Sequence, residues 1–430
     1  MEKIFFCILG RKGWRCLLAI LAMIPLMVQA QFSTCFDEAS LRLDYYITGN
    51  DKTTEYCYKE MIREPYWGGS KTNLIDSLNF GNYFVEMYDA ANGKLIFSRG
   101  YNNLFGEWQN TDEAKRITKG FEETAVMPFP KIEVDVVLGY KTWEGERREG
   151  FRMRVRPDDY FIKTAPANTI PIYDAWIGNK DYSKAVDIVV LPEGYTQEEM
   201  GKFISDCNFF VNSLFAYSPY DKYRDCFNVR AVMAPSADSD VTMPGEHIYR
   251  NTAMNFSFWT FDSERYCMST DSKSIHDLAG KVPYDQIYIL INTKKYGGGG
   301  IYNFYCSSAT GNSFSSDIII HEFGHSFVGL ADEYYYDDDE HMYNLELEPW
   351  EPNITTKGDK WADMISKKTP VPTPENGKYD NVVGLFEGAG YEPKGMYRPM
   401  YDCLMRSFRG KVFCPVCVRA IEKMILYYSE

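Results

Sequence analysis

A change in hydrophobic periodicity near residue 166 constrains the fold of this chain most strongly. Up to about residue 160, apolar side chains alternate with polar ones, as at Leu41, Leu43 and Ile47. This alternation is typical of half-buried strands, and several such segments separated by turn residues predict a β-sandwich. The charged residues between them, such as Arg42 and Asp44, are expected to face solvent.

A different pattern follows the segment 166–171 (PANTIP). Thr196 opens a capping box (Thr-Gln-Glu-Glu), which predicts a helix that ends near Leu214. Short apolar runs predict strands at residues 187–191, 229–233 and 286–292. Strands that alternate with a helix indicate an α/β domain with a mixed sheet. The four glycines at 297–300 predict a flexible loop that leads into a strand at 301–305.

The N-terminus has the pattern of a signal peptide. Basic residues precede an apolar run at 17–28, and Val28-Gln29-Ala30 offers small residues before a cleavage site. The run is shorter than the ~20 residues of a membrane span, so cleavage after Ala30 is favoured over an uncleaved anchor. We therefore expect export to the periplasm, the cell surface or the extracellular space, without stable membrane insertion after cleavage.

These patterns together predict a multidomain α+β protein. The expected parts are a signal peptide (1–30), a β-sandwich (31–165), a linker (166–180) and an α/β domain (181–430). The chain has 60 acidic and 46 basic residues, for a net charge of −14. This charge argues against nucleic acid or an anionic membrane surface as a partner.

The sequence His321-Glu322-Phe323-Gly324-His325 predicts a zinc site on a helix. The two histidines are four residues apart, so both imidazoles leave the same helical face and can bind one Zn²⁺. Glu322 would lie beside the metal, where it can polarise a zinc-bound water. A chance match in a core helix is the alternative. The surrounding residues are apolar, however, and burial of these side chains without a metal would cost several kcal/mol.

A third ligand is expected downstream of the histidine pair. Gly329 and Asp332 have the offset at which metzincin peptidases turn the chain and place their last ligand. Three residues separate His325 from Gly329, where metzincins have two, so the helix is expected to run one residue further. Glu333 is the main competitor for this role, and His341 is a weaker one.

The chain resembles a known enzyme family in several segments. The run HEFGHSFVGLADEYY, the segment 191–195 (LPEGY) and the N-terminal β-domain are similar to the IgA-peptidase family of zinc metallopeptidases. The resemblance implies a metzincin-like catalytic domain with a methionine turn beneath the zinc. Met405 is the residue that matches this turn, although ordinary core packing would also explain a buried methionine. Ser407 stands where some relatives have a tyrosine ligand, so no tyrosine ligand is expected from that position.

The expected function is hydrolysis of a protein or glycoprotein substrate, for which the resemblance suggests immunoglobulin A. The strand after the glycines is expected to border the cleft and to pair with an extended substrate. Two alternatives remain open. One is an aminopeptidase-type metallohydrolase with a downstream glutamate ligand. The other is a binding or adhesion protein in which the β-sandwich carries the function.

Signal cleavage removes two of the 11 cysteines and leaves nine, and export permits disulfides. Cys403, Cys414 and Cys417 are close in sequence and predict one disulfide that ties the methionine turn to the last helix. A structural zinc site is the alternative, but it lacks an obvious fourth ligand. Two further candidate disulfides are Cys35–Cys57 and Cys207–Cys226.

Overall fold

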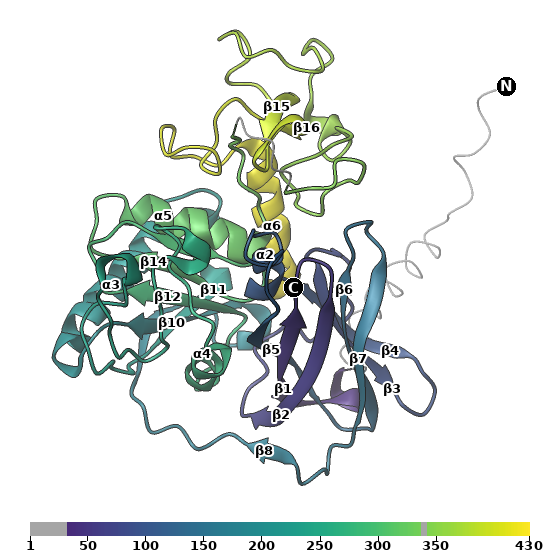
Figure 1. Ribbon diagram of the computed structural model, residues 1–430, viewed down its shortest axis with the longest axis vertical. Helices are drawn as coiled ribbons and strands as arrows, with labels where there is room; N and C mark the ends of the chain where they lie inside the picture. The colour runs from purple at the N-terminus through teal and green to yellow at the C-terminus, as the bar shows by residue number, and fades with distance from the viewer. Residues whose placement is uncertain (1–31, 337–341) are drawn as a thin grey trace, which may run out of the picture.

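The computed structural model of the protein describes residues 32–336 and 342–430. The predicted signal peptide, its cleavage site and His341 lie outside these residues. A strand-rich N-terminal domain and an α/β domain lie side by side, and the C-terminal helix α6 (Pro415–Ser429) runs between them (Figure 1). The multidomain α+β class is confirmed, with several mixed sheets and more strands than helices. No helix in the described part of the chain is long and apolar enough to cross a membrane.

Two four-stranded sheets, with strand orders β5-β1-β2-β8 and β4-β3-β6-β7, build the N-terminal domain. Their strands are β1 (Phe36–Gly49), β2 (Thr54–Glu64), β3 (Tyr83–Asp89), β4 (Leu95–Tyr101), β5 (Lys119–Pro130), β6 (Val134–Lys141), β7 (Arg147–Val155) and β8 (Ile162–Thr164). Leu41, Leu43 and Ile47 of β1 are buried in a core that both sheets share. The hydroxyl groups of Tyr45 in β1 and Tyr101 in β4 lie 2.8 Å apart, so the two sheets face each other.

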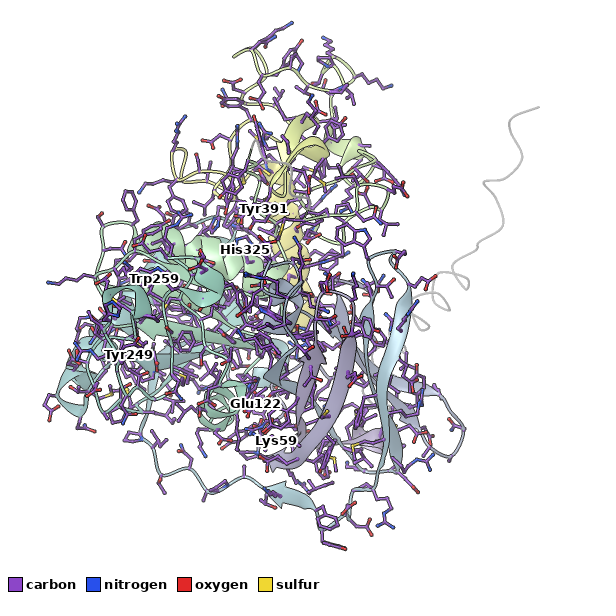
Figure 2. All side chains as sticks on the ribbon, viewed as in Figure 1. Lys59, Glu122, Tyr249, Trp259, His325 and Tyr391 are labelled. Carbon is purple, nitrogen blue, oxygen red and sulfur yellow. The ribbon has the colours of Figure 1, made fainter. Side chains whose placement is uncertain are left out.

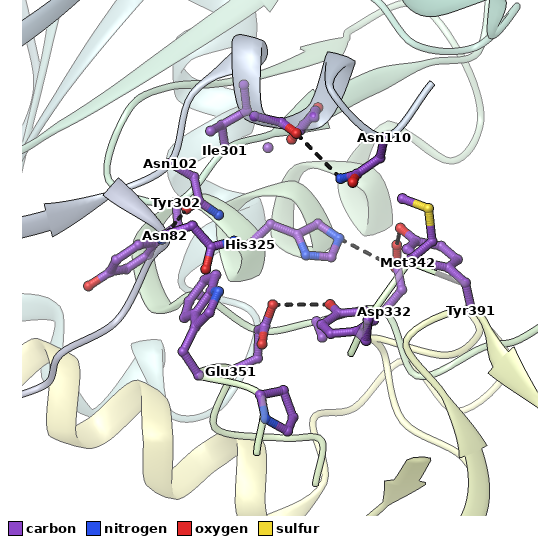
Figure 3. A pocket seen from close by; sticks show the side chains of 18 of the residues that line it. Asn82, Asn102, Asn110, Ile301, Tyr302, His325, Asp332, Met342, Glu351 and Tyr391 are labelled. Carbon is purple, nitrogen blue, oxygen red and sulfur yellow. Dashed lines mark hydrogen bonds and ion pairs between the residues drawn. The ribbon is translucent and has the colours of Figure 1, made fainter. Parts of the chain in front are cut away.

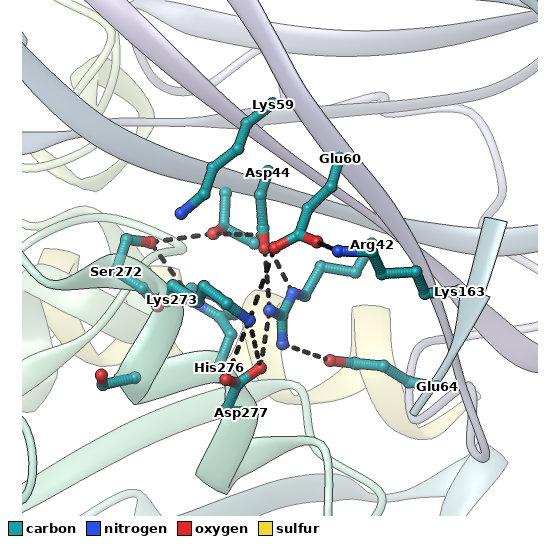
Figure 4. Close-up of polar contacts among 12 residues, drawn as sticks. Arg42, Asp44, Lys59, Glu60, Glu64, Lys163, Ser272, Lys273, His276 and Asp277 are labelled. Atoms are coloured by element: carbon teal, nitrogen blue, oxygen red, sulfur yellow. Dashed lines mark hydrogen bonds and ion pairs between the residues drawn. The ribbon is translucent and has the colours of Figure 1, made fainter. Parts of the chain in front are cut away.

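The charged side chains of β1 differ from the prediction, because Arg42 and Asp44 are buried rather than exposed to solvent. The Arg42 guanidinium donates to Asp44 at 2.8 Å, to Glu64 at 3.1 Å and to Asp277 at 2.7 Å (Figure 4). Asp277 belongs to α4 (Ser272–Ala279) of the second domain. The strand was therefore predicted correctly. The face of β1 that was expected to meet solvent instead lies against α4, where Arg42 is paired with Asp44 and Asp277.

A six-stranded sheet with the order β13-β14-β12-β10-β11-β9 forms the centre of the α/β domain. Its strands are β9 (Ile172–Ile177), β10 (Val186–Glu193), β11 (Phe227–Val232), β12 (Gln286–Ile291), β13 (Gly298–Gly300) and β14 (Cys306–Ala309). β10 is buried along its whole length and pairs in parallel with β11 and β12, as expected of a strand covered on both faces. The edge strands β9 and β13 are antiparallel to their neighbours, so the sheet is mixed as predicted.

Successive side chains of β10 enter two different cores. Ile188 and Val190 pack in the core that contains side chains of α3 (Met200–Leu214), α5 (Ser315–Phe323) and α6. Val189 and Leu191 on the opposite face belong to the core that includes the N-terminal sheets. One face of the sheet is thus continuous with the N-terminal domain, which positions the two domains relative to each other.

Two segments differ from the predicted organisation. Residues 172–177 of the predicted linker form strand β9 of the central sheet. The prediction of a strand at 301–305 is wrong, because the glycines themselves form β13 and residues 301–305 form a turn before β14. A Cβ atom at Gly300 would lie 2.4 Å from the Glu322 carbonyl oxygen. Only glycine therefore allows the edge strand to approach α5 this closely. The remaining α-helix and strands of the described residues are α2 (Leu104–Trp108) and the hairpin of β15 (Phe386–Ala389) and β16 (Glu392–Arg398).

Candidate metal centre and catalytic cleft

The two histidines of the HEFGH segment lie together at the end of α5. His321 is in the last turn of the α-helix, and His325 lies in the π-helical turn η6 (Gly324–Val328) that continues it. Their Nε2 atoms are 3.1 Å apart. The Nδ1 atom of His321 lies 3.1 Å from the Leu404 carbonyl oxygen, and that of His325 lies 2.5 Å from the Leu330 carbonyl oxygen. If the Nδ1 atoms carry the protons, both Nε2 lone pairs are free to bind a metal.

The π-helical turn explains the additional residue between His325 and Gly329. A π-turn absorbs one residue more than an α-turn, and here the Gly329 N–H donates to the Gly324 carbonyl five residues before it. Gly329 then ends the helix with φ 72°, a left-handed conformation that favours glycine. The expected extension of the helix by one residue therefore takes the form of a π-turn, after which the chain reverses.

This reversal brings Asp332 to the histidines. Its Oδ1 atom lies 3.2 Å from His321 Nε2 and 3.4 Å from His325 Nε2, and His325 faces Asp332 across the pocket in Figure 3. The three ligand atoms lie within 4.8 Å of one another. Glu333 points elsewhere, because its Oε1 atom accepts from the Asn353 amide at 3.0 Å and lies 3.3 Å from the Cys417 sulfur. The structure thus brings Asp332, rather than Glu333, to the histidine pair.

The electrostatics of this cluster favour a cation. Burial lowers the pKa of His325, but Asp332 and Glu322 outweigh it and raise that pKa to about 9. Burial acts to raise the pKa of Asp332, yet the two histidines hold it well below its usual value. The Asp332 Oδ1 atom is also buried without a hydrogen-bond partner. Two imidazole nitrogens and a carboxylate that converge in this way fit a zinc-sized cation, which would satisfy all three.

A turn around Met405 supports the histidine helix from below. Met405 is fully buried, and a Cβ atom at Gly324 would lie 3.0 Å from its sulfur. Leu404 supplies the carbonyl oxygen that faces His321, and the Met405 carbonyl accepts the Glu333 N–H at 2.9 Å. This turn therefore contacts the helix and also fixes the segment that carries Asp332.

Glu322 lies between the histidines in sequence and borders the same cleft. Burial raises the pKa of its carboxyl group, against the opposing effect of His321 and His325. A carboxylate with a raised pKa is suited to accept a proton near neutral pH. The edge strand β13 passes directly beside it, as the close approach of Gly300 to the Glu322 carbonyl shows.

The cleft has a volume of about 1810 Å³ and is lined by both domains. Glu107 of α2 contributes from the N-terminal domain and accepts a hydrogen bond from the Tyr266 hydroxyl. Burial raises the Glu107 pKa to about 7. No local sequence pattern indicates these two residues, because their pairing joins segments 159 positions apart.

Tyr391 is a further residue that sequence reasoning missed. Its hydroxyl donates to Asp332 Oδ2 at 2.5 Å, while Oδ1 faces the histidines. Tyr391 and His325 lie close together above the central sheet (Figure 2). The tyrosine precedes β16, far from the HEFGH segment in sequence, so no local pattern could have indicated it. It fixes the orientation of the carboxylate.

Two histidines and an aspartate that converge on one point, beside a glutamate in a cleft, are the features of a metallopeptidase. The IgA Peptidase M64 family model matches residues 177–378 and 375–425, and the Peptidase M64 N-terminus model matches residues 31–152. No curated protein matches the chain significantly. The chain belongs to the IgA peptidase M64 family, and the predicted resemblance is confirmed.

Proposed function

We propose that this protein is an exported, zinc-dependent endopeptidase. His321, His325 and Asp332 would hold the zinc, and Glu322 would act as general base. The observation that carries this proposal is the convergence of two imidazole Nε2 atoms and one carboxylate oxygen within 3.1–3.4 Å of one another. His321 and His325 retain 12% and 16% exposure, so the cluster opens onto the cleft. A catalytic site needs such access for water and substrate.

Bound zinc supplies Lewis acidity, which lowers the pKa of water and polarises a carbonyl group. Glu322 accepts the proton of the attacking water and later delivers it to the leaving amine. Asp332 is held in place by Tyr391, and the histidines by the Leu404 and Leu330 carbonyls. These contacts keep the ligand atoms in position before substrate arrives.

The edge strand β13 supports an extended peptide as the substrate. It pairs with β14 on one side, and on the other side Gly298 is already hydrogen-bonded to Arg265 and Cys267. Gly299 and Gly300 line the cleft beside Glu322. A peptide could add to this part of the edge by main-chain hydrogen bonds, with its scissile bond near the metal. A protein or glycoprotein is the proposed substrate class, and immunoglobulin A is the candidate that the family description suggests.

Two further proposals accompany this function, and one alternative is disfavoured. The helix end, the turn at Gly329 and the buried Met405 support a metzincin-like arrangement of the site. The basic and apolar pattern of residues 1–30 supports export. An aminopeptidase with a glutamate ligand is disfavoured, because the Glu333 carboxylate contacts Asn353 and Cys417 instead of the histidines.

The test is incubation with a panel of immunoglobulins and other glycoproteins, followed by mass spectrometry of the products. The wild type should cleave at least one of them, a chelator should stop cleavage, and added zinc should restore it. Glu322→Ala should reduce turnover by ~10²- to 10⁴-fold, because the proton acceptor is lost. Glu55→Ala, on the exposed face of β2, is the control and should retain wild-type turnover.

Metal content and thermal stability of Glu322→Ala should remain near the wild-type values. Wild-type turnover by Glu322→Ala would contradict the mechanism. A wild type that binds zinc but cleaves nothing across the panel would support the binding-protein alternative instead.

A further inference from the structure

A second group of metal-ligating side chains lies beneath the methionine turn, away from the cleft. It consists of Glu333, Cys403, Cys414 and Cys417, whose ligand atoms all lie within 4.8 Å of one another. All four side chains are buried, with at most 2% exposure. We name this group the cysteine cluster. None of its members lines the catalytic cleft.

The three sulfurs are arranged around the first turn of α6. Cys414 caps this helix, and its sulfur accepts the Cys417 N–H at 3.4 Å. The Cys403 sulfur accepts the Cys414 N–H at 3.3 Å. Hydrogen bonds from backbone N–H groups and the position at a helix N-terminus both stabilise negative charge on sulfur. At Cys403 and Cys414 these backbone contacts act in favour of the thiolate, the form of cysteine that binds metals.

Glu333 is the candidate for the fourth ligand, which the sequence around the cysteines did not indicate. Its Oε1 atom lies 3.3 Å from the Cys417 sulfur and accepts from the Asn353 amide at 3.0 Å. Its Oε2 atom is buried without a hydrogen-bond partner. A buried carboxylate with an unsatisfied oxygen beside three sulfurs is costly unless a cation is bound between them.

The spacing of the sulfurs fits a metal. The Cys403 and Cys417 sulfurs lie 3.8 Å apart. Four ligands at about 2.3 Å from a tetrahedral zinc ion are separated by roughly 3.8 Å, so this contact has the length of one tetrahedral edge. A disulfide would use two of the three cysteines and leave Glu333 and the third thiol buried beside each other. A metal satisfies all four groups.

We propose that Glu333, Cys403, Cys414 and Cys417 bind a second, structural metal ion, for which zinc has the matching ligand preference. This site joins three segments: the chain after Asp332, the methionine turn and helix α6. Asp332 and Glu333 are adjacent, and their carboxylates turn to different clusters. The Leu404 carbonyl that faces His321 directly follows Cys403. The second metal therefore holds in place the backbone that orients the histidine helix.

The predicted disulfides are corrected by this arrangement. The nine cysteines of the described residues are all free thiols. The candidate disulfides Cys35–Cys57 and Cys207–Cys226 are therefore wrong, because all four of these cysteines are free. The disulfide predicted among Cys403, Cys414 and Cys417 is not formed either, because their sulfurs converge with Glu333 instead.

The test counts metals in the full mature protein by elemental mass spectrometry. The wild type should contain two ions per chain, Cys417→Ser one, and His321→Ala one. Cys207→Ser, a buried cysteine in α3 outside the cluster, is the matched control and should retain two. Cobalt-substituted wild type and His321→Ala should both show thiolate-to-cobalt charge-transfer absorption, which Cys417→Ser should lose.

The outcomes separate this proposal from the proposed catalytic site. If the protein holds one ion, and that ion survives His321→Ala but is lost in Cys417→Ser, the result would support metal binding by the cysteine cluster. It would contradict the proposed catalytic zinc site. One ion that is lost in His321→Ala, together with a disulfide among the three cysteines in non-reduced peptides, would overturn the cluster. If Cys417→Ser does not fold, the cobalt spectra of wild type and His321→Ala decide, and absence of thiolate bands overturns the proposal.

Discussion

The two metal-ligating clusters differ in ligand chemistry and in access to solvent. The histidine cluster has two imidazoles and a carboxylate and opens onto the cleft, whereas the cysteine cluster has three sulfurs and a carboxylate and is sealed. Open sites with a free coordination position suit catalysis, and closed four-ligand sites suit structure. Adjacent residues, Asp332 and Glu333, serve the two clusters. The difference shows how one short segment can couple a reactive site to the scaffold that supports it.

The largest expected effect comes from Asp332→Ala. This change removes one ligand of the cleft metal but leaves the cysteine cluster intact. We expect activity to be abolished and the metal content to fall from two ions to one, with thiolate-to-cobalt absorption unchanged. Retention of both metals with measurable turnover would show that Asp332 is not the third ligand.

Glu333→Gln should have the next largest effect, and it acts on stability. If a metal is bound, the change removes a charged partner from a buried site and should lower the free energy of unfolding by about 3–5 kcal/mol. If no metal is bound, the change removes a buried and poorly compensated carboxylate, and stability should be unchanged or higher. Urea denaturation therefore separates the two cases, since only a bound metal predicts a loss of stability.

Glu351→Gln is the matched control for this prediction. Glu351 is also buried, accepts one hydrogen bond from Tyr343 and has an Oε2 atom without a partner. It is not part of either metal-ligating cluster. Equal losses of stability in both variants would indicate a general cost of glutamine at buried glutamates and would remove the support for a second metal.

Tyr391→Phe should have the smallest effect of the three. It leaves every proposed ligand in place but removes the hydrogen bond to Asp332 Oδ2. Loss of such an orienting bond typically reduces metal affinity or activity by ~10- to 100-fold. Zinc titration and turnover on the same preparation would measure it, with Tyr249→Phe as an exposed control. An unchanged zinc affinity and turnover would show that Asp332 needs no support from Tyr391.

Much of the histidine cluster could be predicted from the sequence because its determinants are local. The four-residue spacing places both histidines on one helical face, and the Gly329-to-Asp332 offset lies within a single chain reversal. The π-turn that absorbs the additional residue was not predicted, since it depends on how the helix end packs. Tyr391 and Glu107 act through contacts with distant segments, which no local pattern encodes.

The fold shows the same division between local and distant determinants. Alternation identified β1, but only the packing of α4 explains why Arg42 and Asp44 are buried. Glycine is a poor strand former, so the sequence predicts a loop at the position of β13. Its place in the sheet depends on the close approach of Gly300 to α5. The fourth ligand of the cysteine cluster was missed for a related reason, because Glu333 lies 84 positions from Cys417.

The most direct test of two distinct metal sites is anomalous diffraction from crystals of the wild-type protein, measured on both sides of the zinc absorption edge. The account predicts two peaks that disappear below the edge. One should lie among His321, His325 and Asp332, and the other among the four side chains of the cysteine cluster. A single peak, or a peak at neither cluster, would contradict it.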